Sequence, residues 1–291
     1  MQCYHPECAM KPGQFPDWHA AATAMYTAGL LIIRDVASVG QALAGCPPPG
    51  TRIARPGLTA AALGRLLSAC PCLYSQIDVD PTADAVVHLC EITLGARITS
   101  MNVELAFAVQ HPAKFTIPPV RAYANAGAIS EALCAEVLEN AGLKRITSME
   151  DGRLIWSTPG FIDLNKAPMH ELGSFGDYLI PAAPSNIIIS CKTQAARERL
   201  LNSGIRVDTV GFGFMHTPSE FWTRGKMNTL RRFGFTAIYL PQATYDAICL
   251  RLAQQGRQNE NVNVNGTALY RPLASFGHDM HNVCGATSLK L

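Results

Sequence analysis

An aspartate and a lysine fifteen residues apart are the residues of this 291-residue chain whose types and spacing best predict catalysis. Asp177 opens a short apolar run, 178–180, and Lys192 ends a second one, 186–191. A proline-rich turn joins the runs, so the pattern predicts a β-hairpin that brings both side chains to one edge of a sheet. A carboxylate can hold Mg²⁺, which lowers the pKa of a bound water, while a nearby lysine stabilises transition-state charge. Phosphodiester hydrolysis requires this pairing.

The segment that ends in Ser190-Cys191-Lys192, with Asp177 upstream, resembles the PD-(D/E)XK signature of type II restriction endonucleases. Gly176 stands where this family often has proline. We expect the change to be tolerated, because that side chain carries no metal-binding atom. Ser190 stands where the signature has its second acidic residue. Some restriction endonucleases also lack that acid and use a carboxylate from the following helix.

Glu198 offers such a carboxylate in the helix expected over residues 194–202. Thr193 can cap this helix, which places Glu198 between one and two turns in, close to the strand end. The resemblance implies that Asp177 and Glu198 hold Mg²⁺, with the carbonyl oxygen of Cys191 as a further ligand. The alternative is that Glu198, which lies between two arginines, belongs to a solvated helix face.

A further catalytic carboxylate is expected upstream. In the family, a glutamate on the helix before the first strand often points at the metal, and the run 129–134 is similar to that element. Glu131 is the candidate, on a helix predicted from Ser130, as its cap, to residue 141, with Gly142 ending it. Glu131 could instead serve to stabilise the helix N-terminus. Glu171 is a weaker candidate.

A basic helix is predicted over residues 218–233, with a capping box at 217–220 and Gly234 as its stop residue. Its basic side chains are interleaved with aromatic and apolar ones, and we expect them to contact DNA phosphates or guanine edges. The basic residues of the helix following Lys192 would add positive charge near the site. An ordinary amphipathic helix with a solvated basic face is the alternative. The expected DNA-binding residues are Arg224, Lys226, Arg231, Arg232, Arg197 and Arg199.

The elements that position these residues form an α/β fold. Strand-like runs alternate with helices after residue 125 and predict a mixed central sheet flanked by helices, which the resemblance implies to be restriction-endonuclease-like. We assign residues 125–291 to this core with its C-terminal extension and residues 1–124 to a mostly helical N-terminal region. The expected strands are 154–157, 177–180, 186–190, 207–215 and 236–240, and the further expected helices are 17–43, 59–69, 82–94 and 245–255.

Composition narrows the class of protein. The chain is 48% hydrophobic and 16% charged with a net charge of +2, which favours a folded protein with a sizeable core. No apolar run is long enough for a membrane helix and no signal peptide is evident, so a cytoplasmic protein is expected. The ten cysteines are best interpreted as small buried hydrophobes. Cys3, His5 and Cys8 are typical of half a zinc site, but the second half is not convincing.

The resemblance therefore implies a Mg²⁺-dependent, sequence-specific endonuclease that cleaves double-stranded DNA as a homodimer. A repair or recombination nuclease of the same superfamily is one alternative. A non-catalytic DNA-binding or scaffold protein is another, because Ser190 occupies the position of an acid.

Overall fold

The computed structural model describes residues 31–33, 79–81, 83, 87, 90–91, 94–109, 126–146, 159–165, 176–182, 185–193 and 208–285. The chain forms two compact units. One consists of Met1–Arg97 with Ala106–Ala132, and the other of Ile98–Leu105 with Leu133–Leu291. The boundary expected between residues 124 and 125 stays a prediction.

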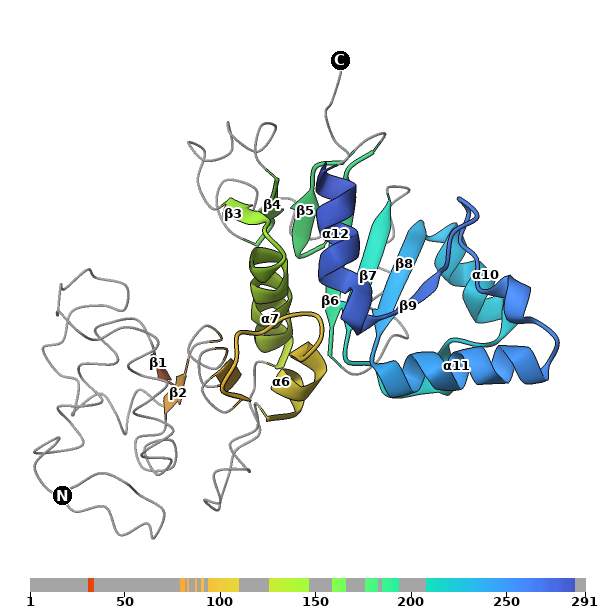
Figure 1. Cartoon of the computed structure of the whole chain (residues 1–291), viewed down its shortest axis with the longest axis horizontal. Coiled ribbons are helices and arrows are strands. Elements are labelled where there is room, and N and C mark those ends of the chain that lie inside the picture. Colours follow the sequence, from red (N-terminus) through yellow and green to blue (C-terminus); the bar gives the residue numbers. More distant parts are fainter. Residues whose placement is uncertain are drawn as a thin grey trace, which may run out of the picture. The chain divides into compact units, whose positions relative to one another are not determined.

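A seven-stranded mixed sheet lies in the second unit, with its strands side by side in chain order (Figure 1). Strand β5 runs antiparallel to both of its neighbours, β4 and β6, and every other neighbouring pair is parallel. The predicted α/β class with a mixed sheet is therefore confirmed. The strands are β3 (Lys144–Ile146), β4 (Gly160–Asp163), β5 (Tyr178–Ile180), β6 (Ile187–Lys192), β7 (Thr209–Gly213), β8 (Phe235–Leu240) and β9 (Tyr270–Pro272).

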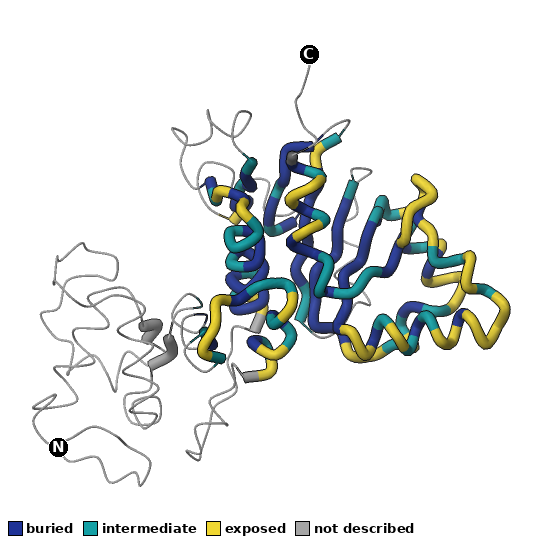
Figure 2. The backbone as a smooth tube through the Cα atoms, in the orientation of Figure 1, coloured by how far each residue is buried: buried dark blue, intermediate teal, exposed yellow. Residues whose placement is uncertain are grey.

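The central strands have the sequences of strands buried on both faces. β7 is buried throughout and β6 at every residue except Lys192, and both lie in the dark-blue centre of Figure 2. Such strands read as continuous apolar runs rather than as alternating ones, as Ile187-Ile188-Ile189 does. Four of the predicted strands correspond to β5, β6, β7 and β8, whereas β3, β4 and β9 were not predicted.

Helices flank both faces of this sheet. Tyr239 and its neighbours Ile238 and Leu240 alternate between the two faces, as successive residues of a strand must. The ring centroid of Phe276 lies 5.0 Å from that of Tyr239 and 4.7 Å from that of Phe212. Ile238 and Leu240, in contrast, pack with apolar residues from two other helices. Phe276 opens α12 (Phe276–Gly285), and the two helices on the other face are α10 (Arg224–Arg232) and α11 (Gln242–Gln254).

Helix α7 (Ala126–Asn140) confirms the helix predicted over residues 130–141, but it begins four residues earlier. Ser130 therefore lies inside the helix with its side chain buried, and the prediction that it caps the helix is wrong. Gly142 follows the helix with φ at +91°, the left-handed conformation expected of the stop residue.

The single helix predicted over residues 218–233 is wrong in its first half. Pro218–Glu220 form a separate 3₁₀ turn, η3, whose Thr217 makes no side-chain cap, and α10 begins after Thr223, which accepts from Lys226 N instead. Phe221 lies between the two elements, and its carbonyl accepts from the Tyr270 hydroxyl at 2.7 Å. Gly234 has φ at +85° and ends the helix region as predicted.

In the first unit, β1 (Leu31–Ile33) pairs antiparallel with β2 (Val79–Pro81). The helix predicted over residues 17–43 is therefore wrong at Leu31–Ile33, where the β-branched pair Ile32-Ile33 favours a strand. The described residues between 83 and 94 are helical, as predicted for 82–94. The helices predicted over 59–69 and 194–202 and the strand predicted over 154–157 lie outside the described residues.

Two further expectations concern the membrane and the cysteines. Within the described ranges, no helix has both the length and the apolar character needed to cross a bilayer. The side chains of Cys90, Cys134, Cys191 and Cys284 are buried, as expected, while that of Cys249 is half-buried. Cys3, His5 and Cys8 lie outside the described residues.

Candidate active site

The β5–β6 hairpin brings Asp177 to the end of β6, as the sequence predicts. Its backbone N–H donates to the Ile189 carbonyl at 2.8 Å, and its side-chain Oδ2 accepts from the Cys191 amide at 2.6 Å. The carboxylate therefore lies one residue from Lys192 along the strand. An aspartate and a lysine at one edge of the sheet are the arrangement that the expected chemistry needs.

Lys192 is the last residue of β6 and is half-buried. It pairs with Gly213 of β7, and its carbonyl accepts from Phe214 N at 3.2 Å. A Cβ at Gly213 would lie 2.5 Å from the Lys192 carbonyl oxygen, so only glycine lets the two strands meet here. Pairing with β7 fixes the backbone of Lys192 and therefore the position of the Cα atom from which its long side chain extends.

Gly176 packs directly against β6. A Cβ at this position would lie 2.3 Å from Ile188 Cγ2 and 3.0 Å from the Ile189 carbonyl oxygen. The close packing therefore gives a steric reason for glycine at the position before Asp177. This reason is independent of the earlier argument that the proline of the family binds no metal.

A short turn after β4 supports the other side of Asp177. The Asn165 amide Nδ2 donates to Asp177 Oδ1 at 3.3 Å, and Leu164 N donates to the Asp177 carbonyl at 3.0 Å. Asp163 lies at the start of this turn with only 4% of its surface exposed, and it accepts from Asn165 N and from Arg145. The sequence did not single out these residues, although an aspartate and an asparagine just after an apolar run are a signal for a polar turn.

Tyr178, the residue after Asp177, is buried in the sheet. Burial, followed by the influence of Cys191 and Cys134, raises the pKa of the Tyr178 phenol. Its ring packs edge-on against Phe161 at 5.4 Å. The Tyr178 phenol therefore stays protonated inside the sheet.

The carboxylate oxygens of Asp177 are ligand atoms of the kind that a hard cation prefers. Each carboxylate oxygen of Asp177 accepts one hydrogen bond from a described residue and keeps lone-pair capacity for Mg²⁺, which prefers oxygen ligands. Within the described residues, no group of three or more His, Cys, Asp or Glu side chains could hold a metal ion. Glu198, the predicted second carboxylate, lies outside the described residues, as do Arg197, Arg199 and Glu171.

The remaining predicted site residues have the following places. Ser190 is fully buried within β6, and the Cys191 side chain is buried as well, so neither offers a side chain to solvent. Glu131 lies on α7 among the residues of the first unit, and its role at the site stays a prediction.

Two arginines of α10 bind within the protein. Arg224 forms an ion pair with Glu260 at 2.7 Å, and Arg231 donates to the carbonyls of Glu260 and Val262. These contacts fasten α10 to the loop that follows α11. Lys226 donates to the Ser219 carbonyl at 3.0 Å, while Arg232 is exposed. Their contacts with DNA stay a prediction.

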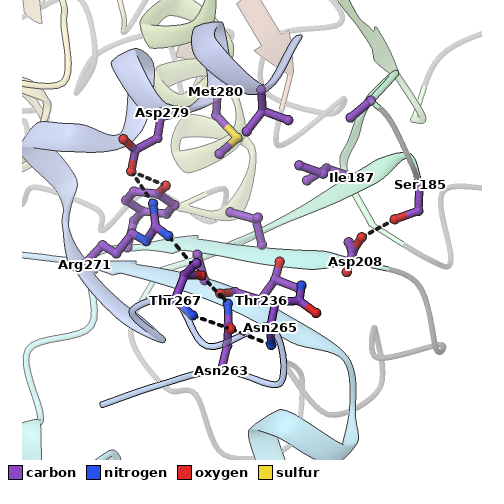
Figure 3. Close-up of a pocket in the computed structure, with 15 residues that line it drawn as sticks. Ser185, Ile187, Asp208, Thr236, Asn263, Asn265, Thr267, Arg271, Asp279 and Met280 are labelled. Carbon is purple, nitrogen blue, oxygen red and sulfur yellow. Dashed lines mark hydrogen bonds and ion pairs between the residues drawn. The ribbon is translucent and has the colours of Figure 1, made fainter. Parts of the chain in front are cut away.

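A pocket of about 300 Å³, lined by apolar as well as polar residues, lies beside the start of β6 (Figure 3). Its walls include Ile187 at the start of β6 and Asp208 just before β7, whereas Lys192 ends β6. Many of its polar groups bind one another: Ser185 donates to Asp208, and the Asn263 amide donates to the Thr236 carbonyl at 2.5 Å. The pocket is therefore separate from the candidate active site.

The chain was compared with known proteins by family, sequence and structure. No protein-family model matches the chain, and no curated protein matches it. A solved structure titled "Restriction endonuclease PspGI-substrate DNA complex" is similar at 15% identity, with 77% of this chain and 81% of that chain covered and a TM-score of 0.37. A TM-score this low does not assign a function to the chain.

Proposed function

We propose that this chain is a Mg²⁺-dependent endonuclease that hydrolyses phosphodiester bonds of double-stranded DNA at a short sequence, in the manner of type II restriction enzymes. The observation that carries the proposal is the hairpin geometry, in which the Asp177 carboxylate accepts from the backbone of Cys191, directly before Lys192. The enzyme would act as a cytoplasmic homodimer, with one active site for each DNA strand.

The residues of the hairpin would divide the work between them. Asp177 would hold the cation, together with Glu198 and the carbonyl oxygen of Cys191, and Glu131 would complete the site. Bound Mg²⁺ would neutralise phosphate charge and lower the pKa of the attacking water. Lys192 would orient that water and stabilise the additional negative charge of the transition state with its ammonium group.

DNA binding would depend on basic side chains of α10 and of the segment that follows Lys192. Lys226 and Arg232 on α10 are exposed and could reach phosphates, and Arg197 and Arg199 follow the catalytic lysine in the chain. Arg224 and Arg231 would have to exchange contacts with Glu260 and its loop for contacts with DNA.

Plasmid DNA tests the proposal. Incubation with the protein and Mg²⁺ should give discrete fragments, and chelation of the metal should prevent cleavage. Nicking, or cleavage that depends on DNA structure, would instead indicate a repair or recombination nuclease. DNA retardation without cleavage would favour a non-catalytic DNA-binding protein, which the serine at position 190 would explain.

The second carboxylate is tested by substitution. Glu198→Ala should lower the cleavage rate by about 10²–10³-fold, because one charged metal ligand would be lost. Glu131→Ala, measured in parallel by single-turnover cleavage, tests the upstream carboxylate. If Glu198→Ala keeps full cleavage activity and Glu131→Ala loses it, the second metal-binding carboxylate is assigned to Glu131.

A further inference from the structure

The Asp177 carboxylate is held from two sides by different parts of the sheet. On one side the donor is the Cys191 amide, a rigid group of the central strand β6, at 2.6 Å from Oδ2. On the other side the donor is the side-chain amide of Asn165, at 3.3 Å from Oδ1. One hydrogen bond alone would let the carboxylate rotate about it. The second one fixes the direction in which the remaining lone pairs point.

The turn that carries Asn165 is itself held in place. Asp163 Oδ1 accepts from Asn165 N at 3.1 Å, and its Oδ2 accepts from Arg145 on β3 at 2.9 Å. Leu164 N, between them, donates to the Asp177 carbonyl at 3.0 Å. A continuous chain of polar contacts thus runs from β3, through the end of β4, to the carboxylate at the start of β5.

Asp163 is the support of this turn rather than a second metal ligand. Its side chain is buried, with 4% exposed, and its two oxygens are bound to Arg145 and to the backbone of Asn165. Release of Asp163 towards a cation would leave the Arg145 guanidinium without this carboxylate partner. Asn165, in contrast, is exposed, so its amide can reach the solvent side of Asp177.

We propose that Asn165 is a positioning residue, which orients the Asp177 carboxylate for a divalent cation, and that Asp163 and Arg145 hold Asn165 in place. This role rests on the proposed function insofar as the cation serves DNA cleavage. Groups that orient a ligand without touching the metal contribute about 10–100-fold to metal affinity. With one exposed donor, we expect the lower end of this range for Asn165.

The experiment compares Asn165→Ala with Asn282→Ala in the full-length protein. Asn282 is a matched control, because it is also exposed and its amide also lies within hydrogen-bond distance of one side chain, that of His278 at 2.8 Å. Calorimetric titration with Mn²⁺ alone measures metal affinity. The Asp177→Asn variant gives the Mn²⁺ affinity that remains when the carboxylate is absent. Cleavage rates across a Mg²⁺ series separate the half-saturating concentration from the maximal rate.

Asn165→Ala should weaken Mn²⁺ binding and raise the half-saturating Mg²⁺ concentration by about tenfold. Its rate at saturating Mg²⁺ should stay within about twofold of wild type, because the ligand itself is retained. Its thermal unfolding midpoint and its DNA affinity in EDTA should match those of Asn282→Ala, which should behave as wild type throughout.

The outcomes distinguish this role from the proposed function. Unchanged metal affinity in Asn165→Ala, with active wild-type protein, would overturn the positioning role and leave the nuclease assignment intact. Absence of cleavage by wild type, with Mn²⁺ binding that needs both Asp177 and Asn165, would support the positioning role and overturn the nuclease assignment. Absence of Mn²⁺ binding by wild type would overturn the positioning role.

Discussion

At the scale of single residues, Asp177 combines two roles. It accepts from Cys191 and Asn165, and in the proposed enzyme it also holds the metal. Replacement by alanine would remove the acceptor for the Cys191 amide as well as the charge, so loss of activity could reflect local unfolding. Asparagine keeps a side-chain oxygen for that amide and is therefore the sharper substitution.

Gly176 gives a prediction about stability. Gly176→Ala should lower the free energy of unfolding by about 1–3 kcal/mol, because the added Cβ would meet Ile188 Cγ2 at 2.3 Å and the backbone of β6. Denaturant unfolding measures the change.

Gly225→Ala is the matched control for this prediction. A Cβ at Gly225 would meet nothing within 4 Å, and the residue lies in α10. Alanine there should stabilise the protein by about 0.5–1 kcal/mol, because it restricts the unfolded chain and favours the helix. Equal stability of Gly176→Ala and wild type would contradict the close packing of the hairpin.

Single residues were also where sequence reasoning was strongest. The hairpin that places Asp177 near Lys192 could be predicted because period and turn chemistry fix it over a short distance in the chain, whereas the catalytic roles of the two residues stay predictions. Asn165 could not be found in that way. Its partner lies twelve residues away on another strand, and only the pairing of β4 with β5 brings the two together.

At the scale of elements, α10 is fastened to the loop after α11 by charged side chains. Glu260 binds both Arg224 and Arg257 at 2.7 Å, and Arg231 donates to two carbonyls of the same loop. The sequence predicts a basic helix but not its internal partners. Glu260 is thirty-six residues from Arg224, in a stretch that reads as a polar loop.

These contacts predict different roles for two neighbouring arginines, Arg231 in stability and Arg232 in DNA binding. Arg231→Ala should lower the free energy of unfolding by about 1–3 kcal/mol, because it removes hydrogen bonds to the loop from a charged donor. Arg232→Ala should leave stability unchanged and weaken DNA binding, with a salt dependence that is less steep by about one unit. Thermal unfolding and DNA titrations at several salt concentrations measure the two effects. A loss of stability in Arg232→Ala equal to that in Arg231→Ala would contradict this division.

The same loop should respond to acid. Hydrogen bonds from Arg257 and Arg224 lower the pKa of Glu260 from 4.5 to about 2. A lowered pKa in the folded state means that the contact contributes fully above pH 4.5 and is lost as the pH falls towards 2. NMR titration should therefore show changes in the signals of residues 258–262 in this window, as Glu260 loses its ion pairs with Arg224 and Arg257, while the Arg231 hydrogen bonds to the loop carbonyls persist.

Glu260→Gln is the control for the acid response. Glutamine cannot ionise, so the variant should show no transition of the loop between pH 4.5 and 2. Persistence of the transition in this variant would assign it to another group.

At the scale of the whole molecule, the sheet is larger than the sequence indicates. Strands β3 and β9 have three residues each and β4 has four, which is too short for a clear alternation of polar and apolar residues. β9 also ends in Pro272, and proline in a sequence normally indicates that no strand is present. Proline is tolerated here because β9 is the edge strand of the sheet. The central strands could be predicted because burial on both faces makes them continuously apolar.

The most direct test of the proposed nuclease compares DNA cleavage with DNA binding in two variants, Asp177→Asn and Lys192→Met. Single-turnover cleavage of plasmid DNA in Mg²⁺ should fall by about 10²–10³-fold or more in each, because one lacks the charged metal ligand and the other the ammonium group. Binding of the same DNA without metal should stay close to that of wild type. Cleavage at the wild-type rate by either variant would contradict the assignment of the active site to the β5–β6 hairpin.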